Sequence, residues 1–468
     1  MAATAMVIGG EPVRSGCTSE VEDPATEEAF DEVAVCTPDL VDRAVRAAQG
    51  AFRPWASLDL AERAERLRAC GRALATAAGE VAELLTREQG KPLGESRAEV
   101  ALAADWFGHT AGLDLPDELV VDDDRVRVGV ERVPFGVVAA VTPSNYPVIL
   151  GTCKIAPALL AGNCVVLKPS PDTPLATLAR AAALQPCLPP GVLNVVAGGA
   201  DVAAALVGHP DVRRVSFTGS VEAGRAVARA AGDGLKGVTL ELGGNDAAVV
   251  LPGTPVDSVA APLFGAAMAN AGQFCAAVKR IYVARDQHDE LVEALSALAA
   301  AAVVGPGLAP RTQIGPLTTR RQRERVRDLV EQARAGGART SVRAQVPERG
   351  HFYPPTIVSL LPGGCALELE EQFGPALPVI AYDHPDLAVD RANGTRYALG
   401  ASVWGEPARA AELSARLTAG TVWINTHGEL RHDTPFGGAK WSGIGVEYGR
   451  WGLLDLTQVR VVHLRRSR

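Results

Sequence analysis

Residues 137–147 read Val137-Val138-Ala139-Ala140-Val141-Thr142-Pro143-Ser144-Asn145-Tyr146-Pro147. The apolar run at its start, made of valine and alanine only, predicts a short strand that is buried on both faces. Two prolines bound the turn that follows, and residues 148–160 then predict a helix. A buried strand, a tight turn and a helix in this order are typical of a parallel sheet with helices on its faces.

The same unit recurs along the chain. Around residues 137–147, further strands are predicted at 165–167, 192–196, 215–217 and 238–240, and helices at 148–160, 174–184 and 220–231. Residues 246–425 repeat the alternation, with strands at 247–250, 280–283, 356–358, 379–382 and 401–404, and helices at 256–271, 287–302, 317–335 and 406–417. The pattern predicts an α/β fold with a doubly wound parallel sheet and a second α/β unit, in which ligands bind at the carboxyl ends of the strands.

The segments outside these two units predict strands at the start of the chain and then a layer of helices. Residues 1–36 are interpreted as strands and turns. Thr37-Pro38 predicts a helix start with a hydroxyl cap. Helices are then predicted at about 60–89 and 94–112, so several helices precede the first clear sheet.

Two further segments predict strands that no neighbour covers. The pattern becomes strand-like from residue 126 to residue 141 and again at 453–464. The stretches 120–135 and 453–464 would therefore be open pairing edges in a monomer. Such edges favour a homo-oligomer, either a dimer or a tetramer.

Composition narrows the class of protein. The chain has 468 residues, of which 47% are hydrophobic and 21% charged, and this balance is typical of a globular protein with large cores. Its net charge of −8 argues against a nucleic-acid partner, and no apolar run approaches the roughly 18–20 residues of a membrane span. The first six residues lack the features of a secretion signal. The eight cysteines show no C-x-x-C pair, which predicts reduced thiols in a cytoplasmic protein and no metal site.

A second informative stretch, Asn270-Ala271-Gly272-Gln273-Phe274-Cys275-Ala276-Ala277, places one cysteine among small residues. The thiolate of a cysteine is a nucleophile, and a free thiol has a pKa of about 8.5. Gly272 and Ala276 leave room for a substrate. A lone cysteine is nevertheless more often an inert buried side chain, so Cys275 needs partners before it counts as a nucleophile.

Two other stretches offer such partners. Leu240-Glu241-Leu242-Gly243-Gly244-Asn245 places a carboxylate at the end of an apolar run, where lost solvation should raise its pKa and suit it to act as a base. Asn145 offers an amide donor in its proline-bounded turn. Taken singly, these residues also fit a structural carboxylate and an ordinary turn asparagine. A nucleophile, a base and an oxyanion donor are the minimum parts for covalent carbonyl chemistry.

Together these stretches resemble the aldehyde dehydrogenase superfamily over nearly the whole chain. Asn145, Glu241 and Cys275 match the family's oxyanion asparagine, general base and nucleophile, in the family's order and with its usual spacing of 34 between the last two (275 − 241). Further matches are Lys168-Pro169-Ser170, Phe217-Thr218-Gly219-Ser220, Glu371-Gln372-Phe373-Gly374-Pro375 and Pro435-Phe436-Gly437-Gly438.

The resemblance implies a domain division and a reaction. A Rossmann-like cofactor domain would comprise 1–117 and 136–245, a catalytic domain 246–441, and oligomerisation segments, including a small β-hairpin, 118–135 and 442–468. Cys275 would attack an aldehyde, hydride would leave for the nicotinamide, and water activated by Glu241 would hydrolyse the thioester. Lys154 would assist electrostatically, although a solvated lysine is the alternative.

Two other functions stay open at this point. Acylating relatives pass the thioester to coenzyme A and typically lack the glutamate, so Glu241 favours hydrolysis to the free acid. A catalytically silent structural protein on the same scaffold is the other alternative. The intact set of Cys275, Glu241 and Asn145 argues against it.

For the cofactor, the resemblance implies NAD, with NADP as the alternative. Lys168 would bond the adenine ribose hydroxyls. Many NAD-specific members carry a glutamate where this chain has Pro171, and its loss leaves Lys168 and Ser170 free to accept a 2′-phosphate. Ser220 can cap a helix that faces the pyrophosphate. The cofactor residues implied by the resemblance are Val141, Pro143, Ser144, Lys168, Ser170, Pro171, Gly199, Phe217, Gly219, Ser220, Leu242, Glu371 and Phe373.

The predicted substrate pocket departs from familiar members of the family. Cys153 falls where many members have tryptophan, and fewer large aromatic residues suggest a wider or more polar pocket. His427 lies in a polar loop that could contact a polar group of the substrate, with a solvated loop as the alternative. The predicted pocket residues are Tyr146, Leu150, Cys153, Phe274, Thr426, His427, Leu430 and Phe436.

Overall fold

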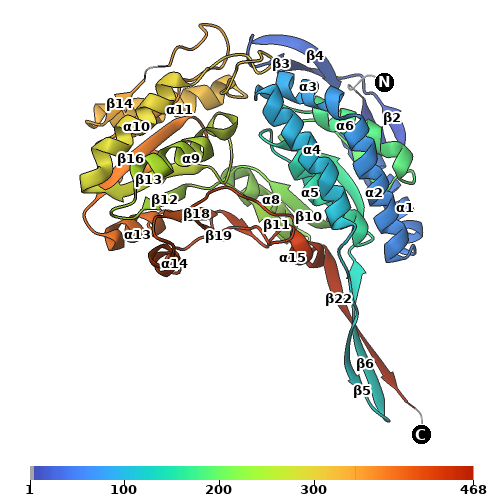
Figure 1. Ribbon diagram of the computed structural model, residues 1–468. Coiled ribbons are helices and arrows are strands. Elements are labelled where there is room, and N and C mark those ends of the chain that lie inside the picture. Colours follow the sequence, from blue (N-terminus) through green and yellow to red (C-terminus); the bar gives the residue numbers. More distant parts are fainter. Residues whose placement is uncertain (1–4, 343, 467–468) are drawn as a thin grey trace.

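The computed structural model describes residues 5–342 and 344–466 and contains two large sheets with helices packed against them (Figure 1). The first residues of the predicted segment 1–117 and the last two of the predicted segment 442–468 lie outside the described residues. The first sheet has the strand order β2-β1-β9-β8-β7-β10-β11-β21. Its strands are β1 (Met6–Ile8), β2 (Glu11–Val13), β7 (Val137–Val141), β8 (Cys164–Lys168), β9 (Leu193–Val195), β10 (Val212–Thr218), β11 (Gly237–Glu241) and β21 (Gly443–Ile444).

The central strands of this sheet are parallel and largely buried. β7 pairs in parallel with β8 and β10, and β11 pairs in parallel with β10. Residues 137–140 have no exposed surface, as the apolar run predicts for a strand covered on both faces. The helices of this half are α1 (Pro38–Ala56), α2 (Leu60–Thr76), α3 (Ala78–Gln89), α4 (Leu93–Thr110), α5 (Pro147–Leu160), α6 (Leu175–Leu184), α7 (Ala200–Gly208) and α8 (Val221–Asp233).

The second sheet has the order β14-β15-β16-β13-β12-β18-β19 and is parallel except for the edge strand β14. Its strands are β12 (Asp246–Val250), β13 (Val278–Ala284), β14 (Arg339–Ser341), β15 (Thr356–Ser359), β16 (Ala376–Tyr382), β18 (Gly400–Trp404) and β19 (Thr421–Ile424). Its helices are α9 (Val256–Met268), α10 (His288–Ala301), α11 (Arg320–Ala335), α12 (Ala366–Leu369), α13 (Pro385–Asn393) and α14 (Pro407–Ser414).

A three-stranded arm projects from the body of the molecule (Figure 1). It consists of β5 (Glu118–Asp122), β6 (Val126–Pro134) and β22 (Thr457–Arg465), in the order β22-β6-β5. Valine and leucine side chains stay exposed along it, for example Val461 at 60%. Small pairs of strands, β3 (Thr18–Asp23) with β4 (Glu28–Ala34) and β17 (Tyr397–Ala398) with β20 (Ala439–Lys440), and the helix α15 (Gly449–Asp455) complete the described elements.

The predicted fold class is confirmed, and the differences lie at element boundaries. The predicted helix 60–89 is two helices separated at Ala77, and the predicted strand 453–464 starts at Thr457 because α15 occupies the residues before it. The strand-like stretch 126–141 divides between the arm and the first sheet. Thr37 precedes α1 as predicted, but its hydroxyl makes no capping hydrogen bond. No helix in the described part of the chain has the length and apolar character needed to cross a bilayer.

Candidate active site

Cys275 follows a strained turn at the end of α9. The helix was predicted to run to residue 271, but it ends at Met268 and residues 269–272 form a short 3-10 turn. Asn270, Ala271 and Gly272 have φ angles of 50°, 53° and 74°. Non-glycine residues in this left-handed region cost about 1–3 kcal/mol each, so the surrounding structure must enforce the turn. One such contact is the backbone N–H of Asn270, which donates to the Glu95 carboxylate at 3.0 Å.

Cys275 lies three residues after this turn, and it is half-buried. Burial raises the pKa of the thiol above its ordinary value, and the charge of Glu241 adds to the rise, while Lys279 opposes it. The backbone N–H of Cys275 donates to no described residue.

Hydrogen bonds of its side chain and of its backbone carbonyl hold Asn145 in place. Its side-chain Nδ2 donates to the Gln273 carbonyl at 3.0 Å, two residues before the cysteine. Its own carbonyl accepts from Lys91 Nζ at 2.6 Å and from Asn270 Nδ2 at 3.0 Å. The Oδ1 atom of Asn145 is buried and accepts no hydrogen bond in the described structure. Nδ2 carries two hydrogens and makes one hydrogen bond in the described structure, so its second hydrogen stays available for an oxyanion beside Cys275.

Lys91 is fixed by a buried ion pair that also caps the next helix. Lys91 Nζ lies 2.6 Å from Glu99 Oε2, and both side chains are buried. Glu99 Oε1 accepts from the first backbone N–H groups of α5, Val148 N at 2.9 Å and Ile149 N at 3.2 Å. A carboxylate at this end of a helix is favourable because the unpaired N–H groups and the helix dipole are positive there. The pair thus connects α4, the Asn145 turn and α5.

Glu241 stands at the carboxyl end of β11, next to Thr218 of β10. Both carboxylate oxygens are buried, and no described residue donates a hydrogen bond to them. Burial raises the pKa of Glu241 well above its ordinary value, as the flanking leucines predict. Glu447 raises that pKa further, and Lys154 lowers it.

Lys154 and Glu447 form a buried pair that the sequence does not reveal. Lys154 Nζ bonds Glu447 Oε1, and Ser216 Oγ lies 2.8 Å from the same carboxylate oxygen and 3.0 Å from Lys154 Nζ. The alternative of a solvated Lys154 is wrong, because its side chain has no exposed surface. Glu447 was not among the predicted site residues. It lies far from Lys154 in the sequence, and no local pattern distinguishes it from an ordinary acidic residue.

The predicted cofactor residues line up along one edge of the first sheet. Val141 pairs with Lys168 of β8 and with Phe217 of β10, so the carboxyl ends of three strands meet there. The turns that follow these strands carry Pro143, Ser144, Ser170, Pro171, Gly219 and Ser220, and Gly199 precedes α7. Ser220 caps α8 as predicted, accepting from Ala223 N at 3.3 Å.

Lys168 has two acidic neighbours that matter for the charge at this edge. Burial lowers the pKa of Lys168 to about 8, and the charges of Asp172 and Asp201 act against that fall. The Ser170 hydroxyl donates to Asp172 Oδ2 at 3.2 Å. Pro171 is exposed. Neither aspartate was among the predicted site residues.

Glu371 and Phe373 come from the second half of the chain. Glu371 lies beside the Gly243-Gly244 turn, and the ring centre of Phe373 lies 5.1 Å from Lys279 Nζ. Glu371 Oε1 accepts from Gly244 N at 3.3 Å. Burial raises the pKa of Glu371 to about 7, and Lys279 opposes the rise. A Cβ atom on Gly243 would lie 2.2 Å from Glu371 Oε2, so any side chain at this position would displace the carboxylate. Leu242, next to this turn, is buried against Gly224 of α8.

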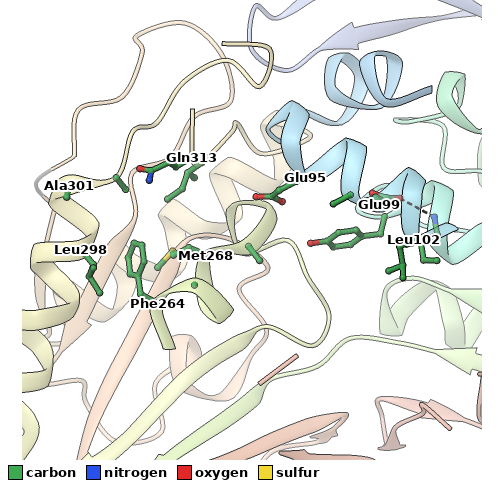
Figure 2. A pocket seen from close by; sticks show the side chains of 15 residues that line it. Glu95, Glu99, Leu102, Phe264, Met268, Leu298, Ala301 and Gln313 are labelled. Carbon is green, nitrogen blue, oxygen red and sulfur yellow. Dashed lines mark hydrogen bonds between the residues drawn. The ribbon is translucent and has the colours of Figure 1, made fainter. Parts of the chain in front are cut away.

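Of the predicted substrate residues, Tyr146 and Phe274 meet directly. Their rings pack edge to face with centroids 5.4 Å apart, and Lys91 Nζ lies 3.7 Å from the centre of the Tyr146 ring. Tyr146 also borders a pocket of about 670 Å³ between α4 and the helices α9 and α10. Figure 2 shows Glu95 and Leu102 on one side of this pocket and Phe264 on the other.

The remaining predicted pocket residues are mostly buried. Leu150 lies inside α5, and Leu430 packs against the first core. Thr426 Oγ1 donates to Glu429 Oε1 at 2.6 Å, within its own loop. His427 is buried, so the alternative of a solvated loop is wrong for this side chain.

The neighbourhood of Cys153 and Phe436 is richer in aromatic residues than predicted. Phe436 stacks on Tyr448 with centroids 5.6 Å apart, and Tyr448 packs edge to face on Trp106 at 4.9 Å. Cys153 is buried, and burial raises the pKa of its thiol. The interpretation of a region poor in large aromatic side chains is therefore wrong here, because Trp106 and Tyr448 come from distant parts of the sequence.

The comparisons with known proteins agree with this geometry. Residues 13–462 match the model of the aldehyde dehydrogenase family. The chain belongs to the aldehyde dehydrogenase family. It is 35% identical to the aldehyde dehydrogenase LUC3 of a Fusarium species, and the match covers 98% of each chain.

Solved aldehyde dehydrogenase structures superpose closely on this chain. The NAD+ complex of the aldehyde dehydrogenase from Bacillus cereus has a TM-score of 0.97 at 32% identity, covering 99% of this chain and 97% of the other. An NADP-dependent enzyme of E. coli has a TM-score of 0.96 at 32% identity, covering 99% and 98%. The predicted family and enzyme class are confirmed.

Proposed function

We propose that this chain oxidises an aldehyde to a carboxylic acid with NAD(P)+, through a covalent intermediate on Cys275. The observation that supports this most directly is the meeting of three groups from separate segments. Asn145 bonds the backbone two residues before Cys275, and the charge of Glu241 acts on the thiol of Cys275. A nucleophile, an oxyanion donor and a base then surround one point.

The first step forms a bond between Cys275 Sγ and the aldehyde carbon. Because burial raises the pKa of the thiol, a base must take its proton as the bond forms, and Glu241, whose own pKa is raised, is matched to that task. The carbonyl oxygen becomes an oxyanion, which accepts from Asn145 Nδ2 and from the backbone N–H of Cys275. Losing one such donor typically costs about 10²–10³ in rate.

NAD(P)+, when bound, accepts the hydride that leaves the carbon attached to Cys275. The residues present fit such a group. Lys168 stands at the sheet edge to meet the ribose hydroxyls, and the capped start of α8 at Ser220 offers backbone N–H groups to a pyrophosphate. Glu371 and Phe373, which come from the other half of the chain, would hold the nicotinamide ribose.

We favour NAD+ over NADP+ because of the charges around Lys168. Pro171 removes the acidic residue that many NAD-specific relatives carry, but Asp172 and Asp201 both act on Lys168 electrostatically. A 2′-phosphate carries about −1.5 to −2 charges near neutral pH, so these aspartates would repel it. Asp172 and Asp201 thus supply near Lys168 the negative charge that Pro171 lacks.

The fate of the thioester depends on Glu241. Its carboxylate has no hydrogen-bond donor in the described structure, so it is free to activate a water molecule. Hydrolysis to the free acid is therefore favoured over transfer to coenzyme A.

The pocket beside Tyr146 is the proposed space for the part of the substrate that does not react. Its volume of about 670 Å³ lies within the range of pockets for small molecules, roughly 300–1,000 Å³. Apolar side chains such as Phe264 and Met268 form most of its wall, and Glu95 and Glu99 add two carboxylates. The chemistry of this wall favours aldehydes with an apolar tail.

The experiment is pre-steady-state kinetics of Glu241→Gln with excess aldehyde and NAD+, without coenzyme A. We expect a slowed burst of NADH that still approaches one equivalent, because the Cys275 thiol must lose its proton without the carboxylate. Turnover after the burst should be slower still, because the thioester accumulates when no base activates the water. General-base catalysis contributes about 10²–10⁴-fold, so the steady-state rate should fall by that factor. A steady state equal to that of the wild type would mean that another group activates the water, and rescue only by coenzyme A would favour the acylating alternative.

The remaining predictions stay proposals. We propose the domain division 1–117 with 136–245, then 246–441, with 118–135 and 442–468 as oligomerisation segments, in a cytoplasmic homodimer or homotetramer. The arm supports the homo-oligomer because its two edge strands, β5 and β22, are open and carry exposed apolar side chains. Sedimentation of the full chain, compared with a variant that carries charged residues along β22, tests the oligomer.

A further inference from the structure

A second polar cluster is buried behind the Cys275 segment. It comprises Asp246 at the start of β12, Ser402 in β18 and His427 in the loop after β19. Trp404 Nε1 donates to Ser402 Oγ at 2.8 Å, and His427 Nδ1 lies 2.8 Å from the same oxygen. His427 Nε2 lies 3.7 Å from Asp246 Oδ2, and neither side chain has exposed surface.

Hydrogen bonds and one close contact link the members of this cluster. The indole N–H of Trp404 can only donate, so Ser402 Oγ accepts it, and the same hydroxyl shares a hydrogen bond with His427 Nδ1. The other ring nitrogen, Nε2, faces Asp246 Oδ2 at 3.7 Å, and neither of these two buried atoms has a hydrogen-bond partner in the described structure. The other carboxylate oxygen of Asp246 accepts from Gly400 N at 3.0 Å.

Residues next to this cluster approach the segment 274–276, which carries Cys275, at two points. A Cβ atom on Gly428, the residue after His427, would lie 3.2 Å from the Phe274 ring and 3.3 Å from the Ala276 carbonyl. On the other side, a Cβ atom on Gly244 would lie 2.5 Å from the Cys275 carbonyl and 2.8 Å from Asp246 Oδ1. The backbone at Gly428 therefore lies close to Phe274 and Ala276, and the backbone at Gly244 lies close to Cys275.

We propose that His427 is a positioning residue which, through its contact with Asp246, holds the loop 426–430 against residues 274–276 and so fixes the placement of Cys275. This inference rests on the proposed function for its catalytic consequence, but the placement itself can be measured separately. His427 lies behind the nucleophile rather than in the open pocket. It acts on the reaction through the Cys275 segment and does not touch the substrate.

The test compares His427→Asn with His427→Gln. A glutamine amide can reach the position of Nε2 and donate to Asp246, whereas an asparagine amide reaches only the position of Nδ1. With asparagine we expect turnover to fall about tenfold or more with KM nearly unchanged, since small misplacements of a reacting group cost up to about 10²-fold. We also expect Cys275 to react faster with iodoacetamide, because the loosened loop uncovers it. Glutamine should restore both values to within about threefold of the wild type, on the same argument.

Peptide mapping separates this role from a general loss of stability. Cys70 and Cys164 are buried in the first half of the chain and should stay unlabelled in every variant. The proposal is overturned if Cys275 labels at the wild-type rate in the asparagine variant, if all three cysteines label together, or if glutamine behaves like asparagine. Should the asparagine variant not fold, Asp246→Asn is expected to give the same selective labelling, and unchanged labelling there overturns the proposal. A wild type that oxidises no aldehyde but keeps this labelling pattern would refute the proposed function alone.

Discussion

Lys154 and Glu447 act on the pKa of Glu241 in opposite directions, and this gives a paired prediction. A general base works only when deprotonated, so the steady-state rate should rise with pH through the pKa of Glu241. Glu447→Gln removes a negative charge, lowers that pKa and moves the acid limb of the profile to lower pH. Lys154→Met removes the positive charge, raises the pKa and moves the limb to higher pH.

The size of the shift follows from the burial of all three groups. A unit charge about 6–8 Å away contributes about 2–3 kcal/mol at an effective dielectric constant of about 20, or about 1.5–2 pKa units. On the acid side of the profile, each pKa unit changes the deprotonated fraction tenfold. At a fixed low pH, the two single variants should therefore differ from the wild type by about 30- to 100-fold in opposite directions.

The assay is kcat at saturating aldehyde and NAD+ between about pH 5.5 and pH 9. The double variant removes both charges, so its acid limb should lie close to that of the wild type. Ser216→Ala is the matched control, because it removes a hydroxyl from the same cluster without changing its charge. Limbs that move in the same direction in both single variants, or that do not move, would refute electrostatic control of Glu241.

Three further outcomes are expected. Cys275→Ala should abolish turnover while NAD+ still binds, as measured by quenching of protein fluorescence, and residual turnover would remove the nucleophile. Asp201→Asn should raise the ratio of kcat/KM for NADP+ to that for NAD+ by about five- to tenfold, because about 1–1.4 kcal/mol of repulsion is relieved, whereas an unchanged ratio would place the 2′-phosphate elsewhere. Gly272→Ala should lower the melting temperature, because its Cβ would lie 2.4 Å from the Gly374 carbonyl and its φ of 74° strains any side chain, and a wild-type melting curve would show that the turn can relax.

The main architecture was predictable because its signals are local. The run from Val137 to Val141 and the similar runs at the other strands specify buried parallel strands, and their carboxyl ends must share one edge. That rule alone brings Lys168 near the Asn145 turn and Ser220. The family resemblance then supplied Glu241 and Cys275 as partners.

Other features could not be predicted, because their causes lie far away in the sequence. The pattern of α9 continues to residue 271, but contacts with Glu95 and Gly374 force the left-handed turn. Glu447 reaches Lys154 from near the end of the chain, and nothing in its own neighbourhood indicates this. His427 belongs to a polar stretch that is typical of an exposed loop, yet its partners Ser402 and Asp246 draw it into the interior.

The arm has a consequence for how the chain is made. β22 pairs with β6 along its whole length, from Thr457 beside Pro134 to Arg465 beside Val126. At a synthesis rate of about 5–20 residues per second, the 322 residues between the two strands (456 − 134) take about 16–64 seconds to emerge. Throughout that interval one side of β6 has no partner within its own chain. The three-stranded arm is therefore completed long after β6 itself has been made.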